Sequence, residues 1–413
     1  MFWLGLAALV GGLCLLSQRL ARQAADSDQL WLAAAAYSVC LLCWPFSARH
    51  WTGWANVLGD LRCWRLARQG FKLARWLQPD WIDAHLGLGT ATLTLEPQAQ
   101  RADAHFMQAY LLRRGTPLWG PGSAALPPGL FLSPEPLAEP PAEPPADAVA
   151  SAHFAQQWAW LQAQGLLSDA ESPLSAQRAH YLQRPPDQAK SSLGTLEATR
   201  LTRAYATQGY VTCDDLLQPE VLAALWQSCL RNTFWHHGYT SGYVGAYLDD
   251  GLGSPLLYQV AADLQAALPE IFDGQQLIYA WAFKCLSRTS GVALHYDAAT
   301  VNVNLWLTPT AANVEPQSGG LLLYPQAPPA HWDLGRYQLS QQQMLSLAQE
   351  QQALTIAYRQ NRAVIFDSRL LHASQPVHFG AAYDQQRINL TFLFGRQPLR
   401  YHRKHPLPAH LLS

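Results

Sequence analysis

The sequence carries little charge, and its charges are balanced. Acidic and basic residues make up only 14% of the 413 positions, and the formal net charge is −1. An ordinary soluble domain has roughly 25% charged residues. Because the chain lacks a basic footprint for nucleic acid, we expect no nucleic-acid partner.

Cysteine spacing typical of a disulfide framework or a metal site is also missing. Three of the seven cysteines, Cys14, Cys40 and Cys43, lie in apolar runs, where free cysteine behaves as a small hydrophobe. The remaining four are scattered: Cys63, Cys213, Cys229 and Cys285. Cys40 and Cys43 form a CxxC pair without a second pair to complete it, so the sequence predicts neither a redox nor a zinc site there.

Features of a secretory signal peptide are also missing, since no basic segment precedes the first apolar run and no clear small-x-small cleavage site follows it, so we do not expect this run to be one. Residues 2–16 and 30–46 are uncharged and carry tryptophan near their ends, as interfacial aromatics do. Both are shorter than the roughly 20 residues that cross a bilayer comfortably. We predict that residues 1–47 form an apolar helical hairpin that anchors the chain in a membrane. The alternative is a pair of buried helices.

Basic residues after the second apolar run indicate how such a hairpin would be oriented. They are Arg49, Arg62, Arg65, Arg68, Lys72 and Arg75. The positive-inside rule then predicts a bacterial inner-membrane location with the bulk of the chain facing the cytoplasm. A soluble cytoplasmic protein is the alternative.

A weak internal repeat runs through residues 48–115. An Ala-x3-Phe-x2-Ala pattern that starts at Ala67 recurs 35 positions later at Ala102. This segment resembles the tetratricopeptide repeat, whose period is close to 34 residues and whose small residues let paired helices approach. The resemblance implies a docking surface for a partner or substrate protein. The alternative is an amphipathic helical hairpin whose spacing matches by chance.

Proline marks a boundary after this repeat. Residues 116–147 are rich in proline and repeat the tetrapeptide AEPP, which excludes regular hydrogen-bonded structure and predicts a semi-rigid linker. Helical sequence resumes over 148–194, which we interpret as a connector. Residues 195–413 remain for a further domain, and about 200 residues are enough for its core.

The residues that carry chemistry lie in this last segment. The stretch GVALHYDAATVNVNLWL contains His295 and Asp297, and RAVIFDSRLLHASQPV places His372 just past a second β-like run. Two imidazoles and one carboxylate on a metal leave one face of an octahedron open, which is the arrangement of non-haem Fe(II) oxygenases. We therefore expect these three residues to be the metal ligands and the catalytic residues. His378 competes with His372 but lies beyond a proline.

A cation and several amides follow the same strands. Arg387 begins RINLTFLF, fifteen residues after His372, and its planar fork suits a carboxylate better than lysine does. Asn389, two residues on, would face the same side of the strand, with a surface amide as the alternative. Asn302 shares a face with Asn304 and is expected to point into a barrel. We assign Arg387, Asn389 and Asn302 to cofactor binding.

The strand before the His-x-Asp pair offers two further candidates. Trp281 and Lys284 lie on it and are expected to line the pocket, with core packing as the alternative for the tryptophan.

Residues 205–395 resemble the double-stranded β-helix of the 2-oxoglutarate/Fe(II)-dependent dioxygenases. The similarity lies in the His-x-Asp, His and Arg set, in SGGLLLYP, and in YATQGYVTCDDLLQPEVLAALWQSC, where a short strand and an acidic turn lead into a helix with proline inside its start. The predicted fold is therefore multi-domain. An α-helical N-terminal part, with an apolar hairpin and tetratricopeptide-like helices, precedes a C-terminal jelly-roll oxygenase domain with flanking helices.

The resemblance implies Fe(II), 2-oxoglutarate and O2 as metal and co-substrates, with ascorbate as an optional reductant. Arg387 would bind the far carboxylate of 2-oxoglutarate. The implied reaction is hydroxylation of a C–H bond in a protein, peptide or membrane-associated small molecule, with release of succinate and CO2. Related halogenases replace the carboxylate at Asp297 by a small residue, so its presence favours hydroxylation or desaturation. The alternative is a non-catalytic jelly-roll scaffold that uses its helical repeats for protein interaction.

Overall fold

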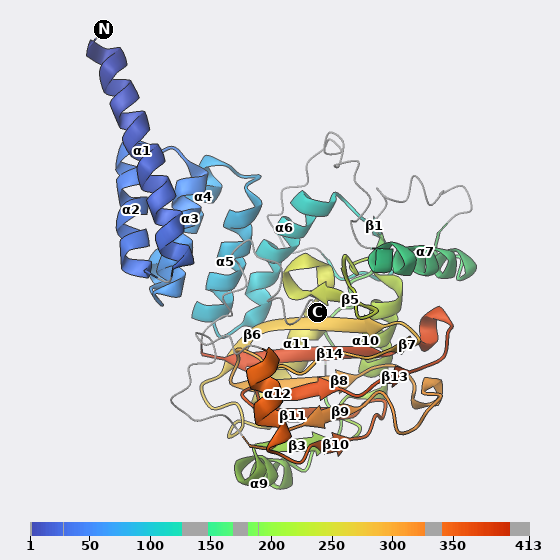
Figure 1. Ribbon diagram of the computed structural model, residues 1–413. Coiled ribbons are helices and arrows are strands. Elements are labelled where there is room, and N and C mark those ends of the chain that lie inside the picture. The colour runs from blue at the N-terminus through green and yellow to red at the C-terminus, as the bar shows by residue number, and fades with distance from the viewer. Residues whose placement is uncertain are drawn as a thin grey trace.

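The computed structural model describes residues 2–27, 29–125, 148–167, 181–188, 190–326 and 341–396. Helices occupy the N-terminal part of the chain, and β-sheet with flanking helices occupies the C-terminal part (Figure 1). The predicted fold class is confirmed. Most of the predicted linker, residues 126–147, and part of the predicted connector, residues 168–180, lie outside the described residues.

The N-terminal part is a row of helices in which each helix packs on the next. They are α1 (Phe2–Asp26), α2 (Leu30–Cys43), α3 (Ala48–Asp60), α4 (Trp64–Leu77), α5 (Ile82–Leu95) and α6 (Asp103–Arg114). Phe71 of α4 and Phe106 of α6, the repeated phenylalanines, are buried against α5. A Cβ on Gly87 would lie 2.2 Å from Phe71 Cε1, and one on Gly89 would lie 2.3 Å from Phe106 Cε1. The two glycines therefore let each ring lie directly on the backbone of α5, as expected for tetratricopeptide-like packing.

The predicted transmembrane hairpin is wrong. Within the described residues, no helix combines the length and the apolar character needed to cross a bilayer. Helix α2 has 14 residues, a rise of about 21 Å, against a hydrocarbon core of about 30 Å. Helix α1 is longer, but Arg19 and Arg22 lie in its second half, and the side chains of residues 2–10 lie outside the description. The predicted inner-membrane location is overturned by the same finding.

Two antiparallel sheets build the C-terminal part. The larger has the order β3 (Tyr210–Cys213), β11 (Ala363–Asp367), β8 (Val301–Trp306), β14 (Ile388–Gly395), β6 (Gln276–Cys285), β5 (Tyr243–Tyr247) and β4 (His237–Tyr239). The smaller has the order β10 (Leu354–Ile356), β9 (Leu321–Leu323) and β12 (His372–Ser374). From β8 to β14 the chain crosses repeatedly between these sheets, from β8 to β9 and β10, then to β11, to β12 and finally to β14, which is the connectivity of a double-stranded β-helix. A further pair joins β7 (Arg288–Thr289) to β13 (Val377–His378).

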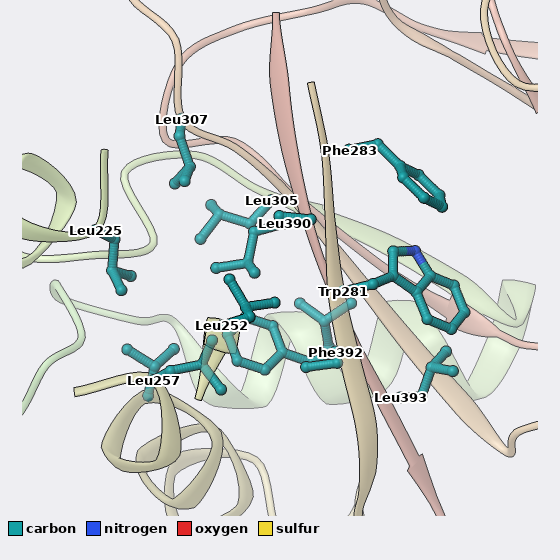
Figure 2. Close-up of a cluster of buried hydrophobic side chains, with 14 of the residues drawn as sticks. Leu225, Leu252, Leu257, Trp281, Phe283, Leu305, Leu307, Leu390, Phe392 and Leu393 are labelled. Atoms are coloured by element: carbon teal, nitrogen blue, oxygen red, sulfur yellow. The ribbon is translucent and has the colours of Figure 1, made fainter. Parts of the chain in front are cut away.

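Helices cover one face of the larger sheet. These are α10 (Pro219–Arg231) and α11 (Pro255–Ala267). Further flanking helices are α7 (Ala148–Ala163), α9 (Ala198–Gln208) and α12 (Gln341–Gln349), of which α12 packs on Leu294, Tyr296 and Leu371. Leu225 of α10 and Leu257 of α11 reach the sheet on the side where Leu390 and Phe392 point, whereas Trp281 points to the other side (Figure 2). Successive side chains of a strand alternate between faces, so Leu390 and Phe392 of β14 form a core with the helices, whereas Leu393 lies on the side of Trp281. The remaining positions of β14 face the interior of the barrel.

Candidate metal centre and co-substrate site

His295 and His372 are brought together by their backbones. The amide of His295 donates to the carbonyl of His372 over 2.9 Å, and the amide of His372 donates back over 2.8 Å. These two bonds set the imidazoles side by side, with ring centroids 4.2 Å apart. Asp297 joins them, and the ligand atoms of the three residues all lie within 4.8 Å of one another. All three residues are buried.

Backbone carbonyls orient both rings. Nδ1 of His295 lies 2.7 Å from the carbonyl of Ala293, and Nδ1 of His372 lies 2.9 Å from that of Leu370. Because a carbonyl can only accept, each Nδ1 carries the proton and each Nε2 presents its lone pair. The two Nε2 atoms lie near Asp297, 4.0 Å from Oδ1 for His295 and 3.4 Å from Oδ2 for His372. This is the tautomer that a metal-ligating histidine requires.

The Asp297 carboxylate is held ionised although it is buried. Burial raises its pKa, but the two neighbouring histidines and the hydrogen bond from the Asn302 amide outweigh burial and hold the pKa below its usual value. Oδ1 is buried and accepts no hydrogen bond from the described residues. An ionised oxygen without a donor is costly to bury, so this atom fits a cation.

Asn302 and Ser368 fix the other oxygen of Asp297. The amide Nδ2 of Asn302 donates to Asp297 Oδ2, and Oγ of Ser368 donates to Asn302 Oδ1 over 2.6 Å. Asn302 and Ser368 are fully buried. The sequence assigns Asn302 to cofactor binding, whereas here both ends of its amide are engaged beside Asp297. Sequence reasoning missed Ser368, since a serine after a strand carries no distinguishing signal.

Arg387 lies just before β14 with its guanidinium buried in the same barrel. Its Nε donates to the carbonyl of Gly319 over 2.6 Å, and its Cζ lies 5.8 Å from the ring centre of Trp306 and 5.9 Å from that of Tyr358. These two rings and the Gly319 carbonyl hold the Arg387 guanidinium in place. Trp306 was not singled out in the sequence, although it shares the alternating face of Asn302.

Strand pairing relates Arg387 to the distal histidine. Leu323 of β9 pairs with His372, and Gly319, which accepts from Arg387, lies four residues before Leu323 along the chain. Arg387 is thereby tied to the segment that leads into the partner strand of His372.

Asn389 belongs to a polar ladder on the interior face of the larger sheet. Its Nδ2 donates to Thr391 Oγ1 over 2.9 Å, and that hydroxyl donates to Asn304 Oδ1 over 2.9 Å. Oδ1 of Asn389 is buried and accepts no hydrogen bond from the described residues. The ladder gives the barrel interior a polar strip beside Arg387.

Two predicted neighbours lie elsewhere. Lys284 was expected to line the pocket with Trp281, but three residues separate them, so they point to opposite faces of β6. The Lys284 Nζ lies over the ring of Tyr383, 2.9 Å from its centre, and burial holds the pKa of Lys284 well below its usual value. His378 pairs with the carboxylate of Glu315. Neither residue joins the triad.

Comparisons with known proteins give structural similarities only. No protein-family model matches the chain, and no curated protein sequence matches it. The non-heme alpha ketoglutarate dependent carbocyclase SnoK from nogalamycin biosynthesis is 12% identical, with a TM-score of 0.37, over 50% of this chain and 90% of that one. A Pseudomonas putida prolyl-4-hydroxylase is 16% identical, with a TM-score of 0.34, over 48% of this chain and 100% of that one. The Arabidopsis OM64 TPR domain is 21% identical, with a TM-score of 0.24, over 25% of this chain and 84% of that one.

Proposed function

We propose that this protein is an Fe(II)- and 2-oxoglutarate-dependent oxygenase of the hydroxylase type. The observation that carries the proposal is the convergence of His295, Asp297 and His372, whose ligand atoms lie within 4.8 Å of one another. Arg387 in the same barrel supplies the cation that a dicarboxylate co-substrate needs. The reaction would oxidise a C–H bond and release succinate and CO2.

The donor set fits Fe(II). Two imidazoles and one carboxylate form the facial triad of non-haem Fe(II) oxygenases and leave open positions for other ligands. The unpaired Oδ1 of Asp297 is the oxygen available to the metal, since Asn302 holds Oδ2. When bound, the iron would supply O2 activation coupled to oxidation of 2-oxoglutarate.

Arg387 would bind the far carboxylate of 2-oxoglutarate. Its Nε is engaged by Gly319, and the guanidinium also hydrogen-bonds the Cys285 side chain. A guanidinium offers a carboxylate paired, charge-assisted bonds. The rings of Trp306 and Tyr358, tilted by 34° to one another, flank the guanidinium and limit its rotation. Asn389, with an unpaired buried Oδ1, lies on the same strand and is a further contact in this proposal.

The substrate class is defined only by the C–H bond that is oxidised. A protein, peptide or small molecule would present a C–H bond to the open face of the triad, and the helices over residues 48–115 would bind a protein partner. The carboxylate at Asp297 occupies the position that a halide would need, which favours hydroxylation.

Succinate formation from 2-oxoglutarate tests the proposal. The purified chain, supplied with Fe(II), ascorbate and O2, should release succinate, and the signal should disappear without iron. His295→Ala and Arg387→Ala should abolish or strongly reduce it. His378→Ala is the matched control, because His378 pairs with Glu315 outside the triad, and it should retain activity. Iron-independent turnover, or equal loss in the control, would contradict the proposal.

A further inference from the structure

A second cluster of metal-ligating side chains lies between the first three helices. Cys14 comes from α1, Cys40 from α2 and His50 from α3, and their ligand atoms all lie within 4.8 Å of one another. Cys40 and His50 are buried, and Cys14 is half-buried. The oxygenase chemistry proposed above uses none of them.

The His50 ring presents a lone pair to this cluster. Its Nδ1 is buried and has no hydrogen-bond partner among the described residues. The ring also hydrogen-bonds the backbone of Trp44. This bond raises the pKa of His50, so the ring donates it and the backbone carbonyl of Trp44 accepts. Since Nδ1 is unpartnered, Nε2 carries this proton and Nδ1 is left bare. A backbone carbonyl that orients the distal nitrogen is the usual partner of a metal-ligating histidine.

Cys43 lies beside this cluster. It follows Cys40 by three residues on the same helix, so the two side chains share a face. The ligand atoms that converge within 4.8 Å are those of Cys14, Cys40 and His50.

We propose that Cys14, Cys40 and His50 bind a single thiophilic cation, for which Zn²⁺ is the best match, with Cys43 as the fourth ligand once the ion is bound. Three cysteines and one histidine are one of the donor sets that hold structural zinc in a closed tetrahedron. Soft thiolates disfavour the hard cations that oxygen-rich sites select. Because the ligands come from three helices, the ion would cross-link α1 and α2 to α3, the first helix of the repeat region.

Cobalt titration of the reduced full-length chain tests this site. Co²⁺ replaces zinc in tetrahedral sites, and thiolate ligation gives a charge-transfer band that nitrogen and oxygen ligands cannot give. We expect this band to saturate at one cobalt per cluster and to disappear when Zn²⁺ is added. Binding of Co²⁺ at His295, Asp297 and His372 contributes no thiolate band, so His295→Ala should leave the band unchanged.

Cluster variants and a matched cysteine control decide the ligand assignment. Cys40→Ser and His50→Gln should weaken Co²⁺ and Zn²⁺ binding by more than about tenfold, because loss of a ligand costs at least as much as loss of its outer partner. Cys63→Ser, which removes a thiol outside the cluster, should bind as the parent does. If Cys40→Ser does not fold, Cys14→Ser provides the same test at a less buried position.

Three results would overturn the proposal. One is the absence of a thiolate–cobalt band in the reduced parent chain. The other is a band of equal strength in Cys40→Ser and Cys14→Ser. Isolation of a Cys14–Cys40 disulfide that reducing agent opens without any gain in zinc affinity would also contradict a metal role. None of these readouts depends on succinate formation, so the zinc proposal and the oxygenase proposal can fail separately.

Discussion

The barrel and the helical part each gather three metal-ligating side chains within 4.8 Å, but they do so with different donors. In the barrel, two imidazoles and a carboxylate leave positions open, and Asn302 and Ser368 fix the carboxylate from behind. In the helical part, two thiols and an imidazole come from three helices, and Cys43 is the proposed fourth ligand. The donors in the barrel thus suit a catalytic metal with open positions, whereas the donors in the helical part suit a structural metal.

The largest effect should come from removing a triad ligand. His372→Ala should weaken Fe(II) binding by more than about 100-fold, since even an outer partner of a ligand is worth ~10–100-fold. The thiolate–cobalt band of the helical cluster should be unchanged. Metal content and cobalt spectra of the same preparation give both readouts. Loss of both sites together would show that the two regions are not independent.

Asn302→Ala tests whether the amide network supports the triad. Without the amide, Asp297 Oδ2 loses its donor, and Fe(II) affinity should fall by ~10–100-fold. Asn304→Ala is the matched control on the same strand and face, because Asn304 bonds Thr391 and not Asp297. Equilibrium Fe(II) titration under anaerobic conditions measures both. Equal losses in the two variants would argue for a general packing defect.

Arg387→Lys separates the co-substrate from the metal. Lysine keeps the charge but loses the planar fork, so the KM for 2-oxoglutarate should rise about tenfold, the equivalent of one charge-assisted hydrogen bond of ~1.5 kcal/mol. Fe(II) affinity should stay within about twofold of the parent. A change confined to Fe(II) affinity would contradict the assignment of Arg387 to 2-oxoglutarate binding.

The pH dependence of binding should differ between the two clusters. The Cys40 thiol, with a pKa of about 11, must lose its proton to bind a cation, so zinc affinity should rise about tenfold per pH unit for each thiol that deprotonates. Asp297 has a lowered pKa and is already ionised at neutral pH, so it adds no such dependence at the triad. Competition titrations with a chelator at about pH 7 and about pH 8 compare the two slopes. Similar slopes would weaken the contrast between the donor sets.

The two clusters also differ in how far the sequence reveals them. His295, Asp297 and His372 could be proposed together because each borders a β-like run, and Arg387 begins another. Cys14, Cys40 and His50 have no informative spacing, since three separate helices bring them together and only tertiary packing makes them neighbours. The sequence therefore showed an incomplete CxxC pair where the structure has a cluster.

The wrong predictions have physical explanations too. Lys284 was grouped with Trp281 by proximity, although alternation along a strand puts residues three apart on opposite faces. The membrane hairpin was inferred from uncharged runs whose length is insufficient in α2 and which continue into charged sequence in α1. In the barrel, Asn302 faced inward as expected, but only its contacts showed that it serves Asp297.

Anaerobic addition of 2-oxoglutarate to the Fe(II)-loaded protein tests the central claim most directly. Chelation of Fe(II) by a 2-oxo acid produces a visible metal-to-ligand charge-transfer band. We predict that the band appears with one iron per chain, requires His295, Asp297 and His372, and needs more 2-oxoglutarate in Arg387→Lys. Iron bound at the triad without this band, or a band that persists in His372→Ala, would contradict the assignment.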